Sequence, residues 1–262
     1  MGESSFRSVR FVLVGPEYGG NVGAAARALK NLGFSRMHVV APRCDLDGDE
    51  ARRMAMDARD VLGAAAVDPD LDVALAGART VIGTTRRTGK HRQPHWRLDR
   101  LVLEMARLAD VGDLAVVFGR EKHGLSDDEI DRCTHLVYFP SSEAYPSFNL
   151  AQAVLLTAYE LRLALLDDSD AGEAPELPAD HGARESMYAH LQAALEVIGF
   201  LHDDTTEPMM RQLRRMLGKA SMTEAEVGIV RGIARQVLWL ASEAGLHVPE
   251  TVKGKGWGGG SR

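Results

Sequence analysis

Short apolar runs alternate with amphipathic segments along the first 166 residues. Unbroken apolar runs of this length are typical of strands that are buried on both faces of a parallel sheet. Such strands are expected at 9–14, 37–41, 81–83, 114–118 and 136–139, and helices at 21–32, 50–57, 71–76, 99–108, 126–132 and 149–166. Strands separated by helices predict an α/β domain, in which helices cover both faces of a parallel sheet.

The pattern changes after residue 166. Residues 167–182 are acidic, contain proline and have few large apolar side chains, which is typical of a linker. Three amphipathic helical patterns follow at 184–199, 207–220 and 224–244, and the last nine residues are rich in glycine. We therefore expect an α/β domain over 1–166, an acidic linker over 167–182, a small all-helical domain over 183–248 and a flexible tail over 249–262.

Three of the expected helices carry capping residues. Gly33 follows the helix at 21–32 and can adopt the left-handed conformation that ends a helix. Ser126 stands three residues before Glu129, which is the spacing of a capping box, and Thr223 precedes the last helical pattern. These residues fix where the corresponding helices are expected to begin or end.

The composition is that of a globular protein, with 45% hydrophobic and 26% charged residues. No apolar run approaches the roughly 20 residues of a membrane helix, and the N-terminus has no signal-peptide pattern. The two cysteines form no disulfide framework, and the nine histidines are scattered apart from His91 and His95, between which Pro94 disfavours one continuous helix face. We therefore expect a cytoplasmic protein with no bound metal and no membrane partner.

The charge is distributed unevenly along the chain. A net charge of −6 and a pI of about 5.9 argue mildly against nucleic-acid binding, because contacts with phosphates dominate that affinity. Residues 84–97, however, carry five basic side chains and no acidic one. This basic strip is either a solvated loop or a surface that faces RNA, and its composition leaves both interpretations open.

A glycine-rich segment, GPEYGGNVGAAAR, follows the first expected strand and contains Asn21 and Arg27. Glycines let a backbone approach a ligand closely, and a helix that begins here presents free N–H groups to an anion. A dinucleotide-binding site is disfavoured, because the G-x-G-x-x-G spacing is absent and no acidic residue ends the next strand. The simpler alternative is a turn followed by a surface arginine.

Two more polar clusters follow later strands. Gly119 and Glu121 stand in FGREKHGL, where a glycine suits a backbone packed against a cofactor and the carboxylate could accept hydrogen bonds from a ribose or an amine. Ser147 and Asn149 stand in YPSFNLAQA, directly before the long helix. The alternatives are a charge at a helix end for Glu121 and plain N-caps for Ser147 or Asn149.

Together the three clusters resemble the signature of SPOUT RNA ribose 2′-O-methyltransferases of the TrmH branch. Their order is N-x-G-x-x-x-R, then F-G-x-E-x-x-G-L, then S-x-N-L-A-x-A. Residues 199–217 are also similar to the C-terminal part of the tRNA (cytidine/uridine-32) 2′-O-methyltransferases within that branch. The resemblance covers nearly the whole chain apart from the linker and the glycine-rich tail.

This resemblance implies a Rossmann-like parallel sheet whose C-terminal part forms a trefoil knot, followed by the small all-helical domain. It also implies that S-adenosylmethionine is the methyl donor and S-adenosylhomocysteine the product. The carboxyl ends of parallel strands form a ligand crevice in many α/β proteins, in agreement with this implication. The residues expected to hold the cofactor are Thr84, Thr85, Arg86, Gly119, Phe139, Pro146, Ser147 and Phe148.

The resemblance further implies a catalytic centre of Asn21, Arg27, Glu121, Ser147 and Asn149. In the family, an arginine is proposed to help remove the proton of the ribose hydroxyl, but a guanidinium group stays protonated at neutral pH. We therefore expect Arg27 to bind the adjacent phosphate and to stabilise the developing alkoxide. The other four residues are expected to orient Arg27, the ribose and the knot loop.

The expected substrate is tRNA, with the ribose of nucleotide 32 in the anticodon loop as the methylated group. The resemblance implies a homodimer whose active site is completed by the partner subunit, so Arg27 acts either in its own subunit or across the interface. The basic strip then becomes part of an RNA-facing surface, and no DNA partner is expected. The expected contacts with RNA phosphates are Arg86, Arg87, Lys90, Arg92, Arg211, Arg214 and Arg215.

Three alternative functions stay open at this point. The chain could methylate another tRNA position or ribosomal RNA, it could be a non-catalytic RNA-binding SPOUT protein, or it could be a nicotinamide-dependent oxidoreductase. The complete set of five catalytic matches argues against the second alternative. The missing dinucleotide fingerprint argues against the third.

Overall fold

The computed structural model describes residues 3–86, 95–166, 177–202, 204–249 and 252. The chain divides into two compact units, Met1–Leu177 and Pro178–Arg262, which are described separately below. Most of the expected linker (167–176) and most of the expected tail (250–251 and 253–262) lie outside the described residues. Within the described residues, no helix is long and apolar enough to cross a membrane.

A seven-stranded sheet forms the centre of the first unit, in the order β3-β2-β1-β6-β4-β7-β5. All six strand pairs are parallel, which confirms the expected α/β class. The strands are β1 (Val9–Val14), β2 (Arg36–Val40), β3 (Ala66–Asp68), β4 (Thr80–Thr84), β5 (His95–Arg97), β6 (Leu114–Phe118) and β7 (His135–Tyr138).

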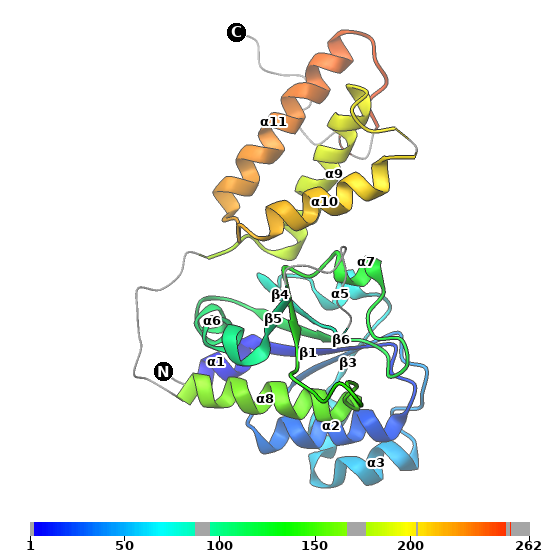
Figure 1. The fold of residues 1–262 in the computed structure, drawn as a ribbon, viewed down its shortest axis with the longest axis vertical. Coiled ribbons are helices and arrows are strands. Elements are labelled where there is room, and N and C mark those ends of the chain that lie inside the picture. The colour runs from blue at the N-terminus through cyan, green and yellow to red at the C-terminus, as the bar shows by residue number, and fades with distance from the viewer. Residues whose placement is uncertain (1–2, 87–94, 167–176, 203, 250–251, 253–262) are drawn as a thin grey trace. The chain divides into compact units, whose positions relative to one another are not determined.

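Helices cover both faces of this sheet, as Figure 1 shows for α2, α3 and α8 on one side and α5 and α7 on the other. The larger core lies on the first side, where alternate β1 residues such as Phe11 and Leu13 pack against α2, α6 and α8. The helices are α1 (Glu3–Ser8), α2 (Gly19–Asn31), α3 (Asp49–Ala55), α4 (Arg59–Gly63), α5 (Leu71–Ala74), α6 (Leu98–Val111), α7 (Asp127–Ile130) and α8 (Leu150–Leu166), with a short 3-10 helix at Met56–Ala58.

The strand order brings four loops to one edge of the sheet. β7 follows β6 along the chain but pairs with β4, so the segment between β6 and β7 crosses over β4. Because all strands are parallel, the loops that follow β1, β4, β6 and β7 leave the sheet at the same edge. This edge positions the candidate site described below, whereas the trefoil knot stays a prediction.

The glycines of α2 correct one expectation about the glycine-rich segment. A Cβ atom at Gly23 would lie 2.1 Å from the backbone oxygen of Ala51, and one at Gly19 would lie 2.9 Å from the backbone oxygen of Asp45. These glycines therefore let α3 and the loop before it pack directly against α2, rather than letting a ligand approach. They serve packing because a methyl group would not fit between the two backbones.

The capping residues confirm three expected helix ends. Gly33 adopts the left-handed conformation with φ +79° directly after α2. Ser126 and Glu129 form the complete capping box of α7, and Thr223 and Glu226 form another at the last helix of the second unit. Four short elements, α1, α4, β3 and β5, were not expected from the pattern of apolar positions.

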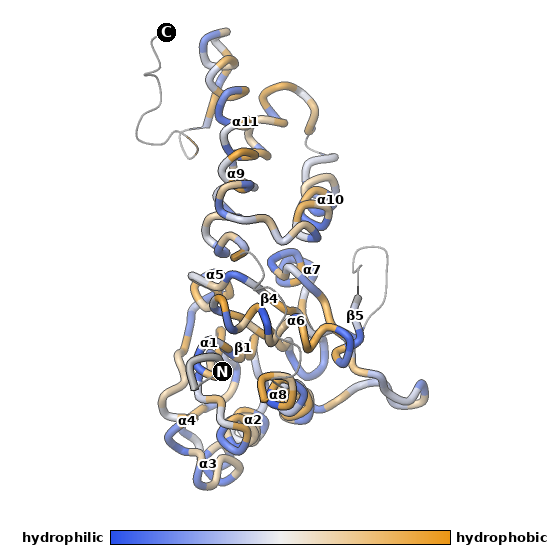
Figure 2. The backbone as a smooth tube through the Cα atoms, turned by 90° about the vertical axis from the view of Figure 1, so that its left-hand side faces the viewer, coloured by the Kyte–Doolittle hydropathy of each residue, from blue (hydrophilic) through white to orange (hydrophobic). Residues whose placement is uncertain are grey.

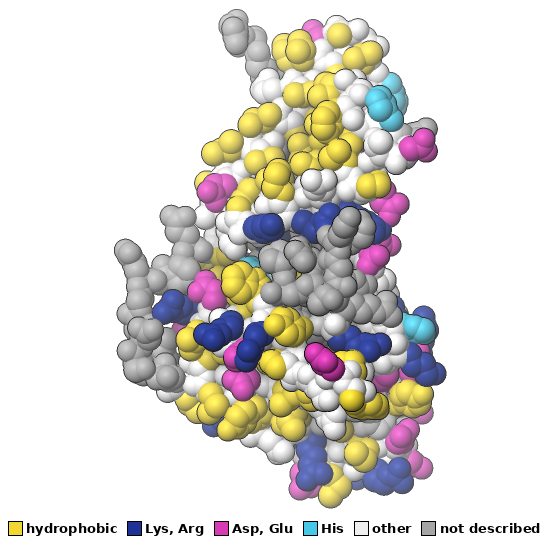
Figure 3. Space-filling view, viewed as in Figure 1, with side chains coloured by type: hydrophobic (Ala, Val, Ile, Leu, Met, Phe, Trp, Pro, Cys, Tyr) yellow, Lys and Arg dark blue, Asp and Glu magenta, His cyan; other side chains and the backbone are white. Residues whose placement is uncertain are grey.

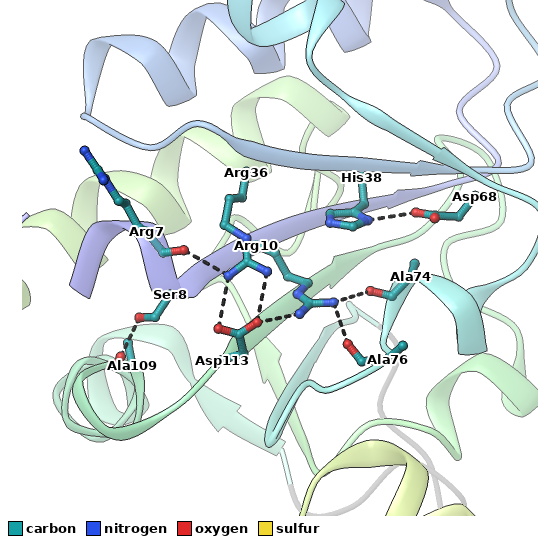
Figure 4. A network of polar contacts seen from close by, with 10 residues as sticks. All are labelled: Arg7, Ser8, Arg10, Arg36, His38, Asp68, Ala74, Ala76, Ala109 and Asp113. Atoms are coloured by element: carbon teal, nitrogen blue, oxygen red, sulfur yellow. Dashed lines mark hydrogen bonds and ion pairs between the residues drawn. The ribbon is translucent and has the colours of Figure 1, made fainter. Parts of the chain in front are cut away.

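A buried ion pair ties three strands together at the amino edge of the sheet, as Figure 4 shows. Arg10 of β1 is 5% exposed and contacts Asp113, which precedes β6, at 2.6 Å. Arg36 of β2 holds the same carboxylate through two hydrogen bonds of 2.9 and 3.0 Å. Burial alone would raise the pKa of Asp113, but the hydrogen bonds from Arg36 and Arg10 outweigh it, so that pKa is lowered.

The second unit consists of α9 (His181–Val197), α10 (Thr206–Gly218) and α11 (Glu224–Glu243), which confirms its expected all-helical structure. Two small apolar clusters, which include Met187 and Leu238, form its interior. Hydrophobic side chains also gather on the outside along α11 (Figure 3), where Ile229, Ile233 and Leu240 are more than 60% exposed.

Candidate active site

One pocket lies where the loops after β4, β6 and β7 meet. It is lined by backbone and side chains of residues 84–86 and 118–125, by the loop before α8 and by the first turns of that helix. All eight residues that the resemblance implies for the cofactor line this single pocket. They are Thr84, Thr85, Arg86, Gly119, Phe139, Pro146, Ser147 and Phe148.

Two loops of the pocket are held by hydrogen bonds to neighbouring strands. The Thr84 hydroxyl donates to the backbone oxygen of Val117 in β6 at 3.1 Å, and the Thr85 N–H donates to Val137 in β7 at 2.9 Å. The β4 loop is therefore fixed to strands on both sides of β4. The sequence identified these residues only through the family motif.

Gly119 is required by the tight turn after β6. A Cβ atom at this position would lie 2.1 Å from the backbone carbon of Gly124 and 2.2 Å from the nitrogen of Leu125. The backbones of Arg120 and Gly124 are joined by two hydrogen bonds, of 2.8 and 3.2 Å, which close the turn. The absence of a side chain therefore shapes this wall of the pocket, in line with the expectation of a closely packed backbone.

An ion pair braces the outer side of the same turn. Arg120 contacts Glu129 of α7 through two parallel hydrogen bonds of 3.0 Å each. Burial alone would raise the pKa of Glu129, but the hydrogen bonds from Arg120 and Ser126 outweigh it and lower that pKa. A bidentate pair of this kind fixes both the position and the direction of the arginine. The β6 turn is consequently held at its backbone and at a side chain.

Three of the five expected catalytic residues form one chain of hydrogen bonds. Asn21, near the start of α2, donates from Nδ2 to Glu121 Oε1 at 2.8 Å. Asn149 donates from Nδ2 to Asn21 Oδ1, also at 2.8 Å. The other Glu121 oxygen accepts from the backbone N–H of Glu17 at 3.0 Å. The chain therefore links the loops after β1, β6 and β7.

Asn149 has a second role as the first residue before α8. Its side-chain oxygen accepts from the Ala151 N–H at 2.9 Å, while its own N–H donates to the side chain of Gln152 at 3.1 Å. The N-cap that the sequence left as an alternative is thus real, but it coexists with the contact to Asn21. The side-chain amides of Asn21 and Asn149 each keep a second N–H that can donate to a substrate oxygen.

Ser147 and Arg27 lie in different places. Ser147 lines the pocket and is exposed, as expected for a residue that meets substrate. Arg27 is exposed on α2, six residues after Asn21, and does not line the pocket. Its side chain makes no hydrogen bond or ion pair with the described residues of its own chain. The structure therefore does not bring Arg27 to the pocket of the same subunit.

Two basic residues near Glu17, Lys122 in the pocket lining and Arg43 outside it, were not expected from the sequence. Lys122 lines the pocket, and its ammonium lies 3.4 Å from the Glu17 carboxylate. The pKa of Lys122 is raised, chiefly by its hydrogen bond to Glu17 and also by Tyr18. Arg43 lies 3.9 Å from the same carboxylate. Lys122 stands inside the FGREKHGL motif, from which only Gly119 and Glu121 were expected to contribute to the site.

The residues expected to contact RNA have diverse surroundings. Arg86 is exposed and lines the pocket, whereas Arg87, Lys90 and Arg92 lie outside the described residues. In the second unit, Arg214 contacts Glu185 at 2.6 and 2.8 Å and lies over the Tyr188 ring at 4.3 Å. Arg211 contacts Glu207 at 2.5 Å, and Arg215 donates to the backbone oxygen of Arg211. The contacts of Arg214 give it a structural role within its own unit.

The pocket fits a cofactor that carries an apolar ring, a ribose and charged ends. Phe118, Leu125 and Leu150 supply buried apolar surface, while the loop backbones and the Thr84 and Thr85 residues supply hydrogen-bonding groups. Pockets for such ligands combine mostly apolar walls with a few placed polar groups. Among the described residues, no cluster of three or more metal-ligating side chains occurs.

Two family models match the chain. Residues 8–159 match the model described as "SpoU rRNA Methylase family". Residues 183–246 match the model described as "tRNA methyltransferase TrmJ, C-terminal domain". The first model covers the sheet and most of α8, and the second covers the three helices of the second unit almost completely.

Curated relatives and solved structures extend this similarity over most of the chain. The chain is 36% identical over 235 residues to a tRNA (cytidine/uridine-2′-O-)-methyltransferase TrmJ of Pectobacterium atrosepticum, covering 88% of this chain and 96% of the relative. It is 36% identical to a tRNA (cytidine/uridine/adenosine-2′-O-)-methyltransferase TrmJ of Pseudomonas aeruginosa, covering 86% and 91%. The crystal structure of TrmJ from Z. mobilis superposes with a TM-score of 0.75 at 30% identity, covering 87% of this chain and 98% of that one.

Proposed function

Because the chain belongs to the SpoU methylase family and carries a TrmJ-type C-terminal domain, it is a tRNA ribose 2′-O-methyltransferase, and we propose that it uses S-adenosylmethionine to methylate nucleotide 32 of the anticodon loop. Nucleotide 32 is proposed from the family resemblance, and one observation supports the cofactor and the reaction. The cofactor residues of three separate loops line one pocket, and the Asn21–Glu121–Asn149 chain of hydrogen bonds lies beside it.

The cofactor supplies a methyl group on a positively charged sulfur, which is open to attack by a ribose oxygen. Thr84, Thr85 and the backbone around Gly119 would hold it in the pocket, and Pro146, Ser147 and Phe148 would enclose it from the side of α8. With the cofactor bound, these residues would limit the access of water to the pocket and would position the methyl group for the ribose oxygen, and such positioning can supply a large part of a rate enhancement.

Glu121 acts in this proposal as a fixed acceptor rather than as a base. Both of its carboxylate oxygens already accept hydrogen bonds, one from Asn21 and one from the Glu17 backbone. These contacts fix the position of its carboxylate and hold Asn21 in one orientation. The second N–H of Asn21 and that of Asn149 are then available to bind the ribose.

An apolar stripe on α8 supports the proposal that the protein is a homodimer. Leu155, Tyr159, Leu163 and Leu166 recur at helical spacing and are 44–58% exposed. Figure 2 shows that most of α8 is hydrophobic, and Figure 3 shows hydrophobic side chains gathered over it. Such a face needs a partner surface, and a second copy of the chain supplies one.

Arg27 is proposed to act across this interface. It is exposed on α2, the helix that packs beside α8, and it does not line the pocket of its own subunit. From the partner subunit, its guanidinium would bind the phosphate next to the target ribose and stabilise negative charge on the ribose oxygen, whose proton would be released to solvent as the methyl group is transferred and S-adenosylhomocysteine is left. Arg86 at the pocket, with the other basic residues expected to face RNA, would bind further phosphates without reading sequence.

Methyl transfer to tRNA transcripts tests the reaction and its position. Wild-type protein with labelled S-adenosylmethionine should methylate a transcript at nucleotide 32, as mapped by mass spectrometry of nuclease fragments. A transcript with a 2′-deoxyribose at nucleotide 32 is the matched control and should receive no methyl group. Equal labelling of both transcripts would reject nucleotide 32, and no labelling of tRNA at all would reject the activity itself.

Mixed dimers test the position of Arg27. One subunit carries Arg27→Ala, and the other carries Asn21→Ala together with Asn149→Ala, so that neither homodimer should be active. If Arg27 acts across the interface, the mixed dimer contains one complete site and should recover up to half of the wild-type activity. Absence of recovery would place Arg27 in the site of its own subunit.

A further inference from the structure

Tyr145 is the most exposed large aromatic side chain beside the pocket. Its side chain is 80% exposed, compared with 37% for Phe148 three residues later. Phe148 packs edge-on against Phe139 with ring centroids 5.6 Å apart, whereas the ring of Tyr145 contacts no other ring or charged group of the described residues. An aromatic ring with so little burial contributes little to folding and is available to a ligand.

Hydrogen bonds within the loop hold the backbone of Tyr145. The Tyr145 N–H donates to the backbone oxygen of Ser142 at 3.1 Å, and the Ala144 N–H donates to the Ser142 hydroxyl at 3.3 Å. The Ser141 hydroxyl donates to the backbone oxygen of Pro146 at 3.3 Å. These contacts close the loop on itself, and Pro146 restricts the backbone directly after Tyr145. The ring is thus presented from a preformed turn.

The position of the loop places Tyr145 beside the pocket. Pro146, Ser147 and Phe148 line the pocket, and Tyr145 directly precedes them. Two residues of extended chain span about 7 Å, so the Tyr145 Cα lies within about 7 Å of the Ser147 Cα. A ribose that reaches the pocket would have its base within reach of this loop, because the base and the 2′-oxygen leave the sugar at neighbouring carbons.

We propose that Tyr145 stacks on the nucleobase of the nucleotide whose ribose is methylated. The proposal rests on the proposed function, because it assumes that a single-stranded RNA nucleotide enters the pocket. Unpaired bases in RNA loops are commonly held by stacking on aromatic side chains. Every base presents an aromatic face, so a ring at this position binds the target nucleotide tightly without selecting among bases.

The kinetics of tRNA methylation separate stacking from a structural role. Stacking on one base is worth about 1–3 kcal/mol, so Tyr145→Leu should raise KM for tRNA by about 5- to 150-fold while kcat changes little. Tyr145→Phe keeps the ring and should remain within about twofold of wild type. Affinity for S-adenosylmethionine and the oligomeric state should be unchanged in both variants. A Tyr145→Leu protein that loses cofactor affinity or dimerisation would overturn the proposal.

An abasic target nucleotide provides the matched control. A tRNA assembled from synthetic halves can carry an intact ribose without a base at the methylated position. Wild type should lose affinity for this RNA by the same factor that Tyr145→Leu loses on normal tRNA, and Tyr145→Leu should bind both RNAs alike. If the missing base weakens both proteins equally, Tyr145 does not contact the target base.

A fluorescence measurement tests stacking without catalysis. 2-Aminopurine at the target position of the same tRNA loses fluorescence when it stacks on an aromatic ring. Quenching is expected with wild type and Tyr145→Phe but not with Tyr145→Leu at saturating protein. If quenching depends on Tyr145 but no methyl transfer occurs, the proposed function fails and the stacking stands. If methyl transfer occurs and quenching is equal in all three proteins, the stacking fails and the function stands.

Discussion

Hydrogen bonds orient Asn21 in one direction. Its nitrogen faces the Glu121 carboxylate and its oxygen faces the Asn149 nitrogen, both at 2.8 Å. A side-chain amide fits this position because it donates on one side and accepts on the other. The family resemblance implied that these three residues share one centre, and the structure joins them by hydrogen bonds. Their roles in methyl transfer stay predictions.

Asn21→Asp should remove this orientation. The new carboxylate cannot donate to Glu121 and places a second negative charge beside it. Loss of a hydrogen bond to a charged group costs about 1.5–3 kcal/mol, so kcat/KM for tRNA methylation should fall by about 10- to 150-fold. Asn31→Asp, the same substitution at the exposed end of α2, is the control and should retain wild-type activity. Activity of Asn21→Asp within twofold of wild type would contradict the orienting role.

The turn after β6 shows how an element depends on one residue without a side chain. Gly119 leaves β6 just where the chain turns back, with the backbone of Gly124 and Leu125 against its Cα. Arg120 and Glu129 then brace the turn from outside. The pocket wall is therefore set by backbone packing, which neither local propensity nor charge pattern reveals.

Gly119→Ala should displace this turn and weaken cofactor binding. Its Cβ atom would lie 2.1 Å from backbone rather than from a flexible side chain, so the loop itself must move. We expect at least about a tenfold increase in Kd for S-adenosylmethionine by calorimetry, because overpacking costs about 1–3 kcal/mol. Gly63→Ala, at a glycine with nothing within 4 Å of its Cβ position, is the control and should bind as wild type does. An unchanged Kd for Gly119→Ala would show that the turn is not part of the cofactor site.

At the scale of the whole molecule, a network of ion pairs and hydrogen bonds stabilises the edge of the sheet opposite the pocket. Arg10 and Arg36 converge on Asp113 there, and Arg10 also donates to the backbone oxygens of Ala74 and Ala76 at 2.8 and 3.0 Å. This network connects β1, β2, α5 and β6 (Figure 4). It stabilises the sheet whose other edge carries the site.

Asp113→Asn should destabilise the first unit in a pH-dependent way. Removal of one partner leaves the buried Arg10 charge uncompensated, and we expect a loss of about 2–3 kcal/mol in free energy of unfolding at pH 7. The pKa of Asp113 is lowered in the folded state, so its contribution is complete above about pH 4, the unfolded value, and is lost as the pH falls through the lowered value.

Urea denaturation from pH 7 to pH 3 measures this effect. The difference in stability between wild type and Asp113→Asn should shrink below about pH 4. Asp60→Asn is the control, because Asp60 forms an exposed ion pair with Lys30 and its loss should change stability only slightly. A difference for Asp113→Asn that stays constant over the whole pH range would exclude the ion pair as its cause.

The sequence by itself determined the elements whose pattern is local. Strands such as β1 and β6 are continuous apolar runs, and the capping boxes at Ser126 and Thr223 fix helix starts through residues three positions apart. The apolar pattern did not predict β5, because His95–Arg97 is short, has no apolar run and becomes a strand only by pairing with β7 at the edge of the sheet. Intrinsic pattern is weak where a neighbouring strand decides the conformation.

Only the tertiary structure decided which residues meet. Asn21 lies 100 positions from Glu121 and 128 positions from Asn149 in the sequence, so no local rule brings these three residues together. The parallel strand order does so, because it gathers the loops after β1, β6 and β7 at one edge. The tertiary structure also leaves Arg27 exposed on the outside of α2 and packs the glycines of that helix against α3. The sequence could not show either outcome, because the contacts of a residue depend on its surroundings as well as on its type.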